Sequence, residues 1–348
     1  MPVGEFPGMH LASFGPKPEI TVIVPSFNEE VVLPETARRL TASLERLGSS
    51  FEIIFVDDGS RDGTPRVLTG LHANDPRIRI VRLSRNFGHQ IAITAGLEYA
   101  RGSAVILIDA DLQDPPEIIG EMVELWRQGN DVVYGTRSRR EGETAFKTLT
   151  AKWFYRFINW LSEIEIPLDS GDFRLLDRKV VDALVSMPER DRFVRGMVSW
   201  TGFKQVSLPY ERAARHAGDS KYTLMRMARF AADGILSFSI APLRLATVLG
   251  VASASAALLG SLVAVGFGLA QGRWISPWAW VLFAVLLLGG AQLLCLGIFG
   301  EYLGRSYTEN KRRPLYFVRE TLGFDEPLSP SEESLLGREL SPRARVES

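Results

Sequence analysis

A pair of aspartates two positions apart could hold a metal ion. Asp109 and Asp111 directly follow an apolar run at 104–108. Side chains two residues apart in an extended segment point to the same side, so both carboxylates can face one ion. Hard oxygen ligands of this kind suit Mg²⁺ or Mn²⁺, and such an ion would neutralise charge on a departing diphosphate. Solvated turns contain the same pattern, so the pair needs support from other residues.

Two further carboxylates hold corresponding places after apolar runs. Glu29 follows the run at 20–24, and Asp58 follows the run at 52–56. Ionised carboxylates there could accept hydrogen bonds from ribose hydroxyls or from the imide of a base. Alternatively, Glu29 could stabilise the N-terminus of the following helix, and Asp58 could serve as a cap or turn residue.

The elements that must position these residues alternate between β-rich runs and helical patterns, which is typical of a doubly wound α/β domain. We predict strands at 20–24, 52–56, 78–83, 104–108 and 131–134, and helices at about 30–46, 64–73, 88–100 and 115–128. Mostly apolar strands predict a parallel central sheet that helices cover on both faces. Ligands bind beyond the carboxyl ends of such strands, so all three acidic sites would meet at one edge.

Composition and missing motifs narrow the class of protein. The formal net charge of -1 gives no electrostatic reason to expect a nucleic-acid partner. The single cysteine, Cys295, cannot form an intramolecular disulfide, and the polar part of the chain is expected to be cytoplasmic. The lack of a Gly-x-Gly-x-x-Gly and of a Walker loop disfavours dinucleotide oxidoreductases and phosphotransferases.

Two charge-free segments near the C-terminus predict two transmembrane helices, at about 243–270 and 277–300. Residues 245–272 and 274–300 contain no charge, and these runs of 28 and 27 residues exceed the roughly 20 that cross a bilayer. The loop between them holds only Arg273, whereas basic residues flank the pair on both outer sides. By the positive-inside rule, the catalytic domain and both termini would be cytoplasmic, in a multi-pass inner-membrane protein. A buried hairpin in a soluble protein is the alternative.

These patterns divide the chain into five regions. They are a flexible leader at 1–18, an α/β domain at 19–220, an amphipathic region at 221–241, the two spans within 242–302, and a cytoplasmic tail at 303–348 that is disordered after about 325. The amphipathic helix is expected to lie in the membrane interface, although it could also pack on the α/β domain.

Several motifs in one order give the chain a family resemblance over about residues 18–320. They are PSFNEE at 25–30, DDGS at 57–60, RNFGHQ at 85–90, DADLQDPPE at 109–117, YGTR at 134–137, SGDFRLLDR at 170–178 and RHAGDSK at 215–221. The chain resembles glycosyltransferase family 2, and within it the polyisoprenyl-phosphate branch that includes dolichol-phosphate mannose synthase and bactoprenol glucosyltransferases. The resemblance implies a GT-A (Rossmann-like) nucleotide-sugar domain followed by a two-helix membrane anchor.

The resemblance also implies roles for individual residues. Nucleotide contacts are implied for Pro25, Phe27, Glu29, Val56, Asp58, Arg215 and Lys221. Metal or diphosphate contacts are implied for Asp109, Asp111 and Gln113, and contacts with the acceptor phosphate for Arg137 and Arg195. Asp172 is the candidate catalytic carboxylate, with Asp111 beside the metal, although Asp172 could equally form an ion pair with Arg174 or another arginine. His89 suits a structural hydrogen-bonding role better than that of a base.

The family chemistry is an inverting displacement in which an acceptor oxygen attacks the anomeric carbon. A phosphate monoester is mostly dianionic at neutral pH, because its second pKa is about 6, and it needs little help from a general base. We therefore expect Asp172 to orient groups or balance charge rather than to accept a proton. Fixed arginines would bring the two anions together.

We expect transfer of glucose from a UDP-sugar to undecaprenyl phosphate, with Mg²⁺ or Mn²⁺ as cofactor and a homo-oligomer as a possible assembly. Mannose, GlcNAc and formamido-arabinose are alternative sugars. A non-enzymatic nucleotide-sugar-binding membrane protein is the alternative from another class, and the intact Asp109 and Asp111 argue against it. A processive synthase is disfavoured because the chain lacks a Gln-x-x-Arg-Trp motif and further spans.

Overall fold

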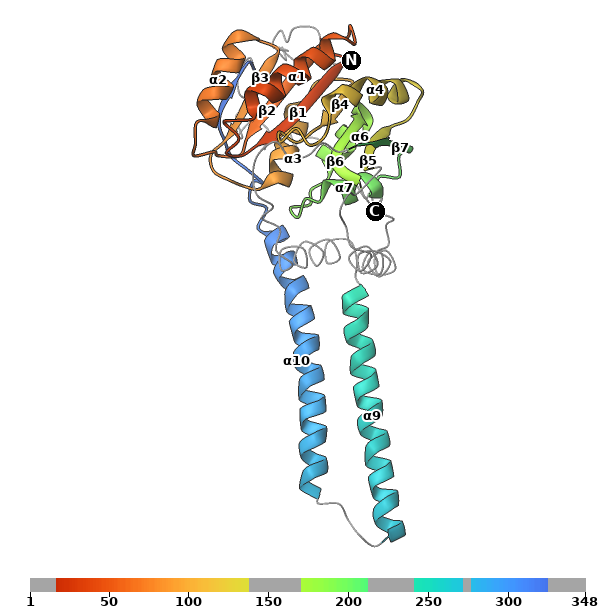
Figure 1. Ribbon diagram of the computed structural model, residues 1–348. Coiled ribbons are helices and arrows are strands. Elements are labelled where there is room, and N and C mark those ends of the chain that lie inside the picture. Colours follow the sequence, from red (N-terminus) through yellow and green to blue (C-terminus); the bar gives the residue numbers. More distant parts are fainter. Residues whose placement is uncertain (1–16, 138–169, 212–240, 272–276, 325–348) are drawn as a thin grey trace, which may run out of the picture.

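One eight-stranded sheet forms the centre of the α/β domain in the computed structural model, which describes residues 17–137, 170–211, 241–271 and 277–324 (Figure 1). The strands are β1 (Ile20–Ser26), β2 (Phe51–Asp57), β3 (Ile78–Leu83), β4 (Ala104–Leu107), β5 (Val132–Arg137), β6 (Ser170–Asp177), β7 (Gln205–Tyr210) and β8 (Val318–Leu322). Their order across the sheet is β7-β5-β6-β4-β1-β2-β3-β8. The predicted α/β class is therefore confirmed.

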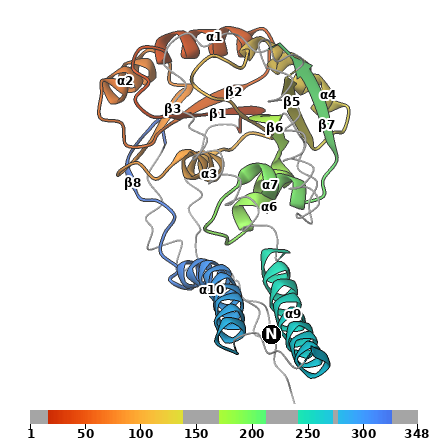
Figure 2. The ribbon, with the colours of Figure 1, turned by 60° about the horizontal axis from the view of Figure 1, so that its bottom comes forward.

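Helices cover both faces of this sheet (Figure 2). They are α1 (Leu33–Glu45), α2 (Thr64–Asn74) and α4 (Ile119–Arg127) on one face, with the short 3-10 helix η1 (Pro116–Ile118), and α3 (His89–Tyr99), α6 (Arg178–Ser186) and α7 (Val194–Trp200) on the other. Alternate residues of β1 enter two separate cores, because successive strand side chains point to opposite faces. Val22 lies in the same cluster as Leu40 of α1, whereas Ile23 lies with Ile93 of α3.

β1, β2, β3 and β4 form a parallel block within the sheet. β6 enters antiparallel between β4 and β5, and β7 runs parallel to β5. The expectation of a parallel central sheet is therefore met only in part. β5 runs in the same direction as β4, and among the described strands β6 and β8 run antiparallel to their neighbours, so the sheet is mixed. The inserted strand escaped prediction because Asp172 and Arg174 interrupt its apolar residues, so the segment resembles a polar loop.

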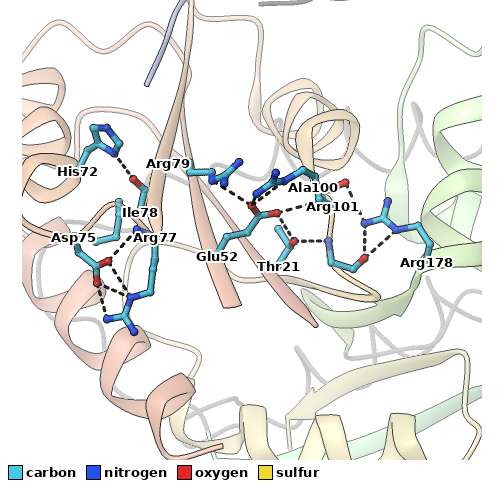
Figure 3. Close-up of polar contacts among 11 residues, drawn as sticks. Thr21, Glu52, His72, Asp75, Arg77, Ile78, Arg79, Ala100, Arg101 and Arg178 are labelled. Atoms are coloured by element: carbon cyan, nitrogen blue, oxygen red, sulfur yellow. Dashed lines mark hydrogen bonds and ion pairs between the residues drawn. The ribbon is translucent and has the colours of Figure 1, made fainter. Parts of the chain in front are cut away.

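The buried carboxylate of Glu52 connects the parallel strands near their amino-terminal ends (Figure 3). Glu52 accepts hydrogen bonds from Thr21 Oγ1 at 2.7 Å and from Arg101 Nη2 at 3.0 Å, and its carboxylate lies 3.2 Å from Arg79 Nε. The side chain of Glu52 is 3% exposed, and those of Arg79 and Arg101 are each 17% exposed. These contacts join β1, β2, β3 and the turn that precedes β4.

Two long helices, α9 (Ala241–Gln271) and α10 (Pro277–Asn310), extend side by side away from the sheet (Figures 1 and 2). They occupy the segments predicted as membrane spans, at 243–270 and 277–300. Within the described residues, one stretch, Leu287–Asn310, is long and apolar enough to cross a membrane. This stretch supports a membrane association of α10.

The chain returns to the sheet after α10. β8 pairs antiparallel with the outer edge of β3, with Ile80 opposite Leu322. Phe324 then packs edge-on against Tyr99, with ring centroids 5.1 Å apart. This strand was not predicted, because VRETL is short and carries two charged residues.

Several predicted features lie outside the described residues. They are the leader at 1–16, a helical stretch near 144–162, Arg215, Lys221, the amphipathic helix up to residue 240 and the tail beyond 324.

Candidate active site

The loops that follow β1 and β2 hold each other through hydrogen bonds. Asn28 N donates to Ser60 Oγ at 2.9 Å, and Asn28 Oδ1 accepts from Arg61 N at 2.9 Å. Glu30 Oε2 accepts from Gly63 N at 2.7 Å. Asn28 has a φ of 57°, a left-handed conformation in which asparagine is enriched. The two motifs at 25–30 and 57–60 therefore form one connected edge.

Asp58 fastens the loop that precedes α3 to this edge. Its carboxylate is buried and accepts hydrogen bonds from Phe87 N at 2.7 Å and Gly88 N at 2.9 Å. Burial raises the pKa of Asp58, while the two backbone N–H groups lower it in part. The turn-stabilising role that the sequence left open for Asp58 is what this geometry provides.

Gly59 lets the same two loops approach closely. Its φ is +69°, and a Cβ added at Gly59 would lie 2.4 Å from the backbone carbon of Arg85. A larger residue would therefore push the 85–88 loop away from Asp58. The loop must stay in place because α3 begins directly after it, at His89.

A tight turn follows β4 and carries the two aspartates of the first motif. Asp111 Oδ1 accepts from Gln113 N at 3.1 Å, and Leu112 has a φ of 58°. The Asp109 carboxyl has a pKa raised to about 6 by burial, to which the charges of nearby carboxylates add although His89 opposes them. Negative charge is thus concentrated beyond the end of β4.

His89 stands between Asp109 and Asp172. Its Nε2 lies 3.4 Å from Asp109 Oδ1 and 3.3 Å from Asp172 Oδ2. Arg195 Nε donates to Asp172 Oδ1 at 2.7 Å. The four side chains come from the turn after β4, the start of α3, β6 and α7. The fold therefore gathers, around one histidine, residues that are up to 106 positions apart in the sequence.

Asp172 is an ion-paired carboxylate, in contact with Arg195 and His89. Burial alone would raise the pKa of Asp172, yet the hydrogen bond with His89 and the charge of Arg195 hold it well below its usual range. Burial also lowers the pKa of His89, but Asp172 and Asp109 outweigh it, so that this pKa is raised overall. Behind them, burial lowers the pKa of Arg174 to about 10, which still leaves it protonated at neutral pH.

The acidic residues fit a divalent ion that is shared with a substrate. Among the residues that the structure describes, no group of three or more His, Cys, Asp or Glu side chains could hold a metal by itself. Mg²⁺ is often bound by one or two carboxylates together with substrate phosphates and water, which suits Asp109 and Asp111. The raised pKa of Asp109 agrees with this, because a bound cation would relieve the crowding of negative charge. Gln113 is buried beside them.

The other predicted residues lie at the same edge or at the ends of strands. Pro25 and Val56 are buried partners in the parallel register of β1 and β2. Phe27 follows β1 and is 41% exposed, and Glu29 N donates to Thr64 Oγ1 at 2.8 Å. Arg137 is the last residue of β5. Arg215 and Lys221 lie outside the described residues.

Sequence reasoning did not include His89 or Gln90 in the site. Gln90 Nε2 lies 3.5 Å from Asp172 Oδ2, and Gln90 Oε1 accepts from Val194 N at 2.9 Å. The signal for both residues was their place in the RNFGHQ motif at 85–90.

The chain matches the Glycosyl transferase family 2 profile over residues 21–185. An uncharacterized glycosyltransferase of Bacillus subtilis (strain 168), YkcC, is 46% identical over 88% of this chain and 95% of its own length. The chain belongs to glycosyltransferase family 2. This family 2 protein is therefore a glycosyltransferase, and the predicted resemblance is confirmed.

Two further relatives of this family 2 enzyme have names that state a substrate. They are a prophage bactoprenol glucosyl transferase homolog of Escherichia coli (strain K12) and the bactoprenol glucosyl transferase of Shigella phage SfV, each 39% identical over 86% of this chain and 98% of its own length. Among solved structures, the mannosyltransferase PcManGT from Pyrobaculum calidifontis, in complex with GDP-Man and Mn²⁺, is similar with a TM-score of 0.41 and 19% identity. That alignment covers 80% of this chain and 87% of PcManGT.

Proposed function

We propose that this glycosyltransferase transfers a sugar from a nucleotide-sugar to a polyisoprenyl phosphate at the cytoplasmic face of a membrane. Glucose, UDP and undecaprenyl phosphate are the favoured sugar, nucleotide and acceptor. The likeness to bactoprenol glucosyl transferases over 98% of their length carries the proposal. It is supported by the pairing of Arg195 with Asp172, which lies near His89 and Asp109, because a transfer between two anions needs a fixed cation for the acceptor phosphate.

The reaction that we propose is a single displacement with inversion. An oxygen of the lipid phosphate forms a bond to the anomeric carbon, while the bond from that carbon to the donor diphosphate breaks and the nucleoside diphosphate leaves. The phosphate is largely dianionic at neutral pH, so no residue of the chain has to remove a proton. Asp172, which is ion-paired with Arg195, would orient that arginine and His89.

Residues on both sides of the cluster complete the proposed site. Asp109 and Asp111 would hold Mg²⁺ or Mn²⁺, which when bound stabilises charge on the leaving diphosphate. Pro25, Phe27, Glu29, Val56 and Asp58 would line the nucleotide subsite, with Gln113, Arg215 and Lys221 near the diphosphate and Arg137 and Arg195 near the acceptor phosphate. The edge formed by the interlocked loops after β1 and β2 supports the nucleotide assignment.

The proposed anchor consists of both α9 and α10, with the loop at 272–276 outside the cell membrane and the catalytic domain inside. Such an anchor would hold the site at the level of the lipid headgroups, where the acceptor phosphate lies. The apolar stretch Leu287–Asn310 supports the second span.

A donor and acceptor panel tests the proposed function. Purified full-length protein in detergent is incubated with undecaprenyl phosphate and labelled UDP-glucose, UDP-GlcNAc, GDP-mannose or UDP-formamido-arabinose, with Mn²⁺, with Mg²⁺ or with EDTA. We expect a lipid-linked glucose whose anomeric configuration is opposite to that of the donor, and no product with EDTA. Transfer of a different sugar would replace glucose in the proposal, and the absence of any lipid product with every donor would refute it.

A further inference from the structure

The C-terminal end of α10 is bonded to the loop at 187–193, which connects α6 with α7. Arg305 Nη1 donates to Asp191 Oδ2 at 2.7 Å. One helical turn further on, Glu309 Oε1 accepts from Arg190 N at 2.8 Å. The guanidinium of Arg190 also donates to the carbonyl oxygen of Arg313. We call these contacts the α10 clasp.

The clasped loop leads directly into the candidate site. Arg195 stands four residues after Asp191, in the first turn of α7, and donates to Asp172 at 2.7 Å. The residue before it, Val194, donates through its backbone N–H to Gln90 Oε1. Few residues separate the clasp from Arg195, so a shift of the loop relative to α10 would move this arginine.

The loop is also stiff enough to transmit such a constraint. The guanidinium of Arg192 donates to the carbonyl oxygens of Leu184 and Met187, at 2.9 and 2.5 Å, and so folds the loop back on the end of α6. Arg190, Asp191 and Arg195 therefore belong to one braced segment between α10 and Asp172.

Stability is a weak explanation for the clasp. The side chains of Arg305 and Asp191 are 18% and 53% exposed, and ion pairs of this kind contribute little to the free energy of folding. A shift of Arg195, in contrast, would weaken its contacts with the acceptor phosphate, because charge-assisted hydrogen bonds depend on geometry. The clasp connects α10, which contains the apolar stretch Leu287–Asn310, to the segment that carries Arg195. This arginine donates to Asp172 in the candidate site.

We propose that Arg305, Glu309, Arg190 and Asp191 are positioning residues that fix the height of Arg195 above the membrane surface. This inference deepens the proposed function and rests on it, because the ligand that Arg195 would meet is the phosphate of a membrane lipid. The clasp fixes the position of α10 relative to the acceptor subsite. The donor subsite at the ends of β1 and β2 does not depend on the clasp.

Charge reversal tests the clasp through the acceptor. Initial rates are measured for Arg305→Asp, Asp191→Arg and the double variant, with undecaprenyl phosphate varied at saturating donor and then the reverse. Each single variant should raise the acceptor KM about fivefold and leave kcat and the donor KM near those of the unaltered protein. The double variant, in which the charges are exchanged, should restore the acceptor KM to within about twofold of that of the unaltered protein. The conservative Arg305→Lys should keep the acceptor KM within the same range.

A matched control comes from an ion pair of the same length elsewhere. Arg127 Nη2 lies 2.7 Å from Glu19 Oε1 and joins the end of α4 to the start of β1. Arg127→Asp should leave the acceptor KM unchanged. The proposal would be overturned if the single clasp variants kept a normal acceptor KM or raised the donor KM equally. It would also be overturned if the double variant had an acceptor KM as high as that of the single variants.

Proteolysis separates the clasp from the proposed function. A glutamate-specific protease should cut after the exposed Glu189 faster in Arg305→Asp than in the unaltered protein, and at the original rate in the double variant. Unchanged cleavage in Arg305→Asp would show that the clasp does not hold the loop. If the unaltered protein transfers no sugar to undecaprenyl phosphate, the proposed function fails and the acceptor role fails with it, whatever the cleavage shows.

Discussion

Asp109 stands where several negative charges meet, and its neighbours explain what a single substitution should do. Replacing it with asparagine removes the charge that a divalent ion would compensate, while the similar shape of asparagine preserves the turn. We expect Asp109→Asn to lower turnover ~100-fold at saturating Mn²⁺ and to raise the Mn²⁺ concentration at half-maximal rate.

The measurement is the initial rate of lipid glycosylation across a Mn²⁺ titration. Asp182→Asn is the matched control, because Asp182 is an exposed carboxylate on α6 whose side chain is 65% accessible. Equal losses in the two variants, or an Asp109→Asn enzyme that keeps its turnover, would remove Asp109 from the metal site.

In the folded protein the pKa of Asp172 lies well below its ordinary value, so the carboxyl stays ionised as the pH falls into the mildly acidic range. Its ionised form is favoured, so it stays charged from mildly acidic to alkaline pH and cannot be the source of an activity change in that range. We expect Asp172→Asn to lower kcat/KM for the acceptor by a similar factor at every pH from about 6 to 9, because the orientation of Arg195 is lost rather than a base. Recovery of the variant at high pH, measured by full pH–rate profiles, would assign the base role to Asp172 instead.

Part of the candidate site could be predicted from the sequence. Asp58 and Asp109 each follow a recognisable apolar strand, so their common edge follows from strand direction alone. The contact of His89 with Asp172 spans 83 positions and depends on a strand that enters the sheet from the other half of the chain. No local pattern contains that information, and only the family motifs marked both residues.

Glu52 connects the amino-terminal ends of the parallel strands. Removing its side chain leaves Arg79 and Arg101 without their shared carboxylate in a largely buried place. We expect Glu52→Ala to lower the free energy of unfolding by about 3 kcal/mol, as when one partner of a buried ion pair is deleted. Denaturant unfolding measures the loss, and Glu35→Ala serves as control, because it breaks an exposed pair with Arg38 and should change stability by less than about 0.5 kcal/mol.

The strand β8 makes a second prediction for the elements. Truncation after residue 315 removes β8 and exposes the edge of β3, whereas truncation after residue 324 keeps the strand and Phe324. We expect the shorter protein to have the lower melting temperature and to aggregate, because an open apolar edge invites pairing with other chains. Equal melting temperatures for the two truncated proteins, measured in the same detergent, would show that β8 contributes nothing.

The predicted elements differ in how well sequence patterns marked them. β1, β2, β3 and β4 are rich in β-branched and other apolar residues, and they were predicted within three residues at each end, as were α2 and α3. β6 and β8 were missed because neither contains a run of more than two apolar residues, and each pairs with strands far along the chain. Periodicity reports local burial and carries little information about such pairings.

For the whole molecule, the orientation of the helix pair is the feature to test. We expect an alkaline phosphatase fused in the loop at 272–276 to be active outside the membrane, and a green fluorescent protein fused at the C-terminus to fluoresce inside. The opposite pattern would separate the catalytic edge from the cytoplasmic donor. Reversing Arg273 to Glu is the control, since a single loop charge should not invert the pair.

The position of β8 has a consequence for biosynthesis. The outermost strand of the sheet is encoded after both long helices, so the ribosome has already produced α9 and α10 when β3 receives its neighbour. The α/β domain therefore cannot complete its sheet before both long helices have been synthesised. With the proposed anchor of α9 and α10, the last strand would close the sheet at the membrane.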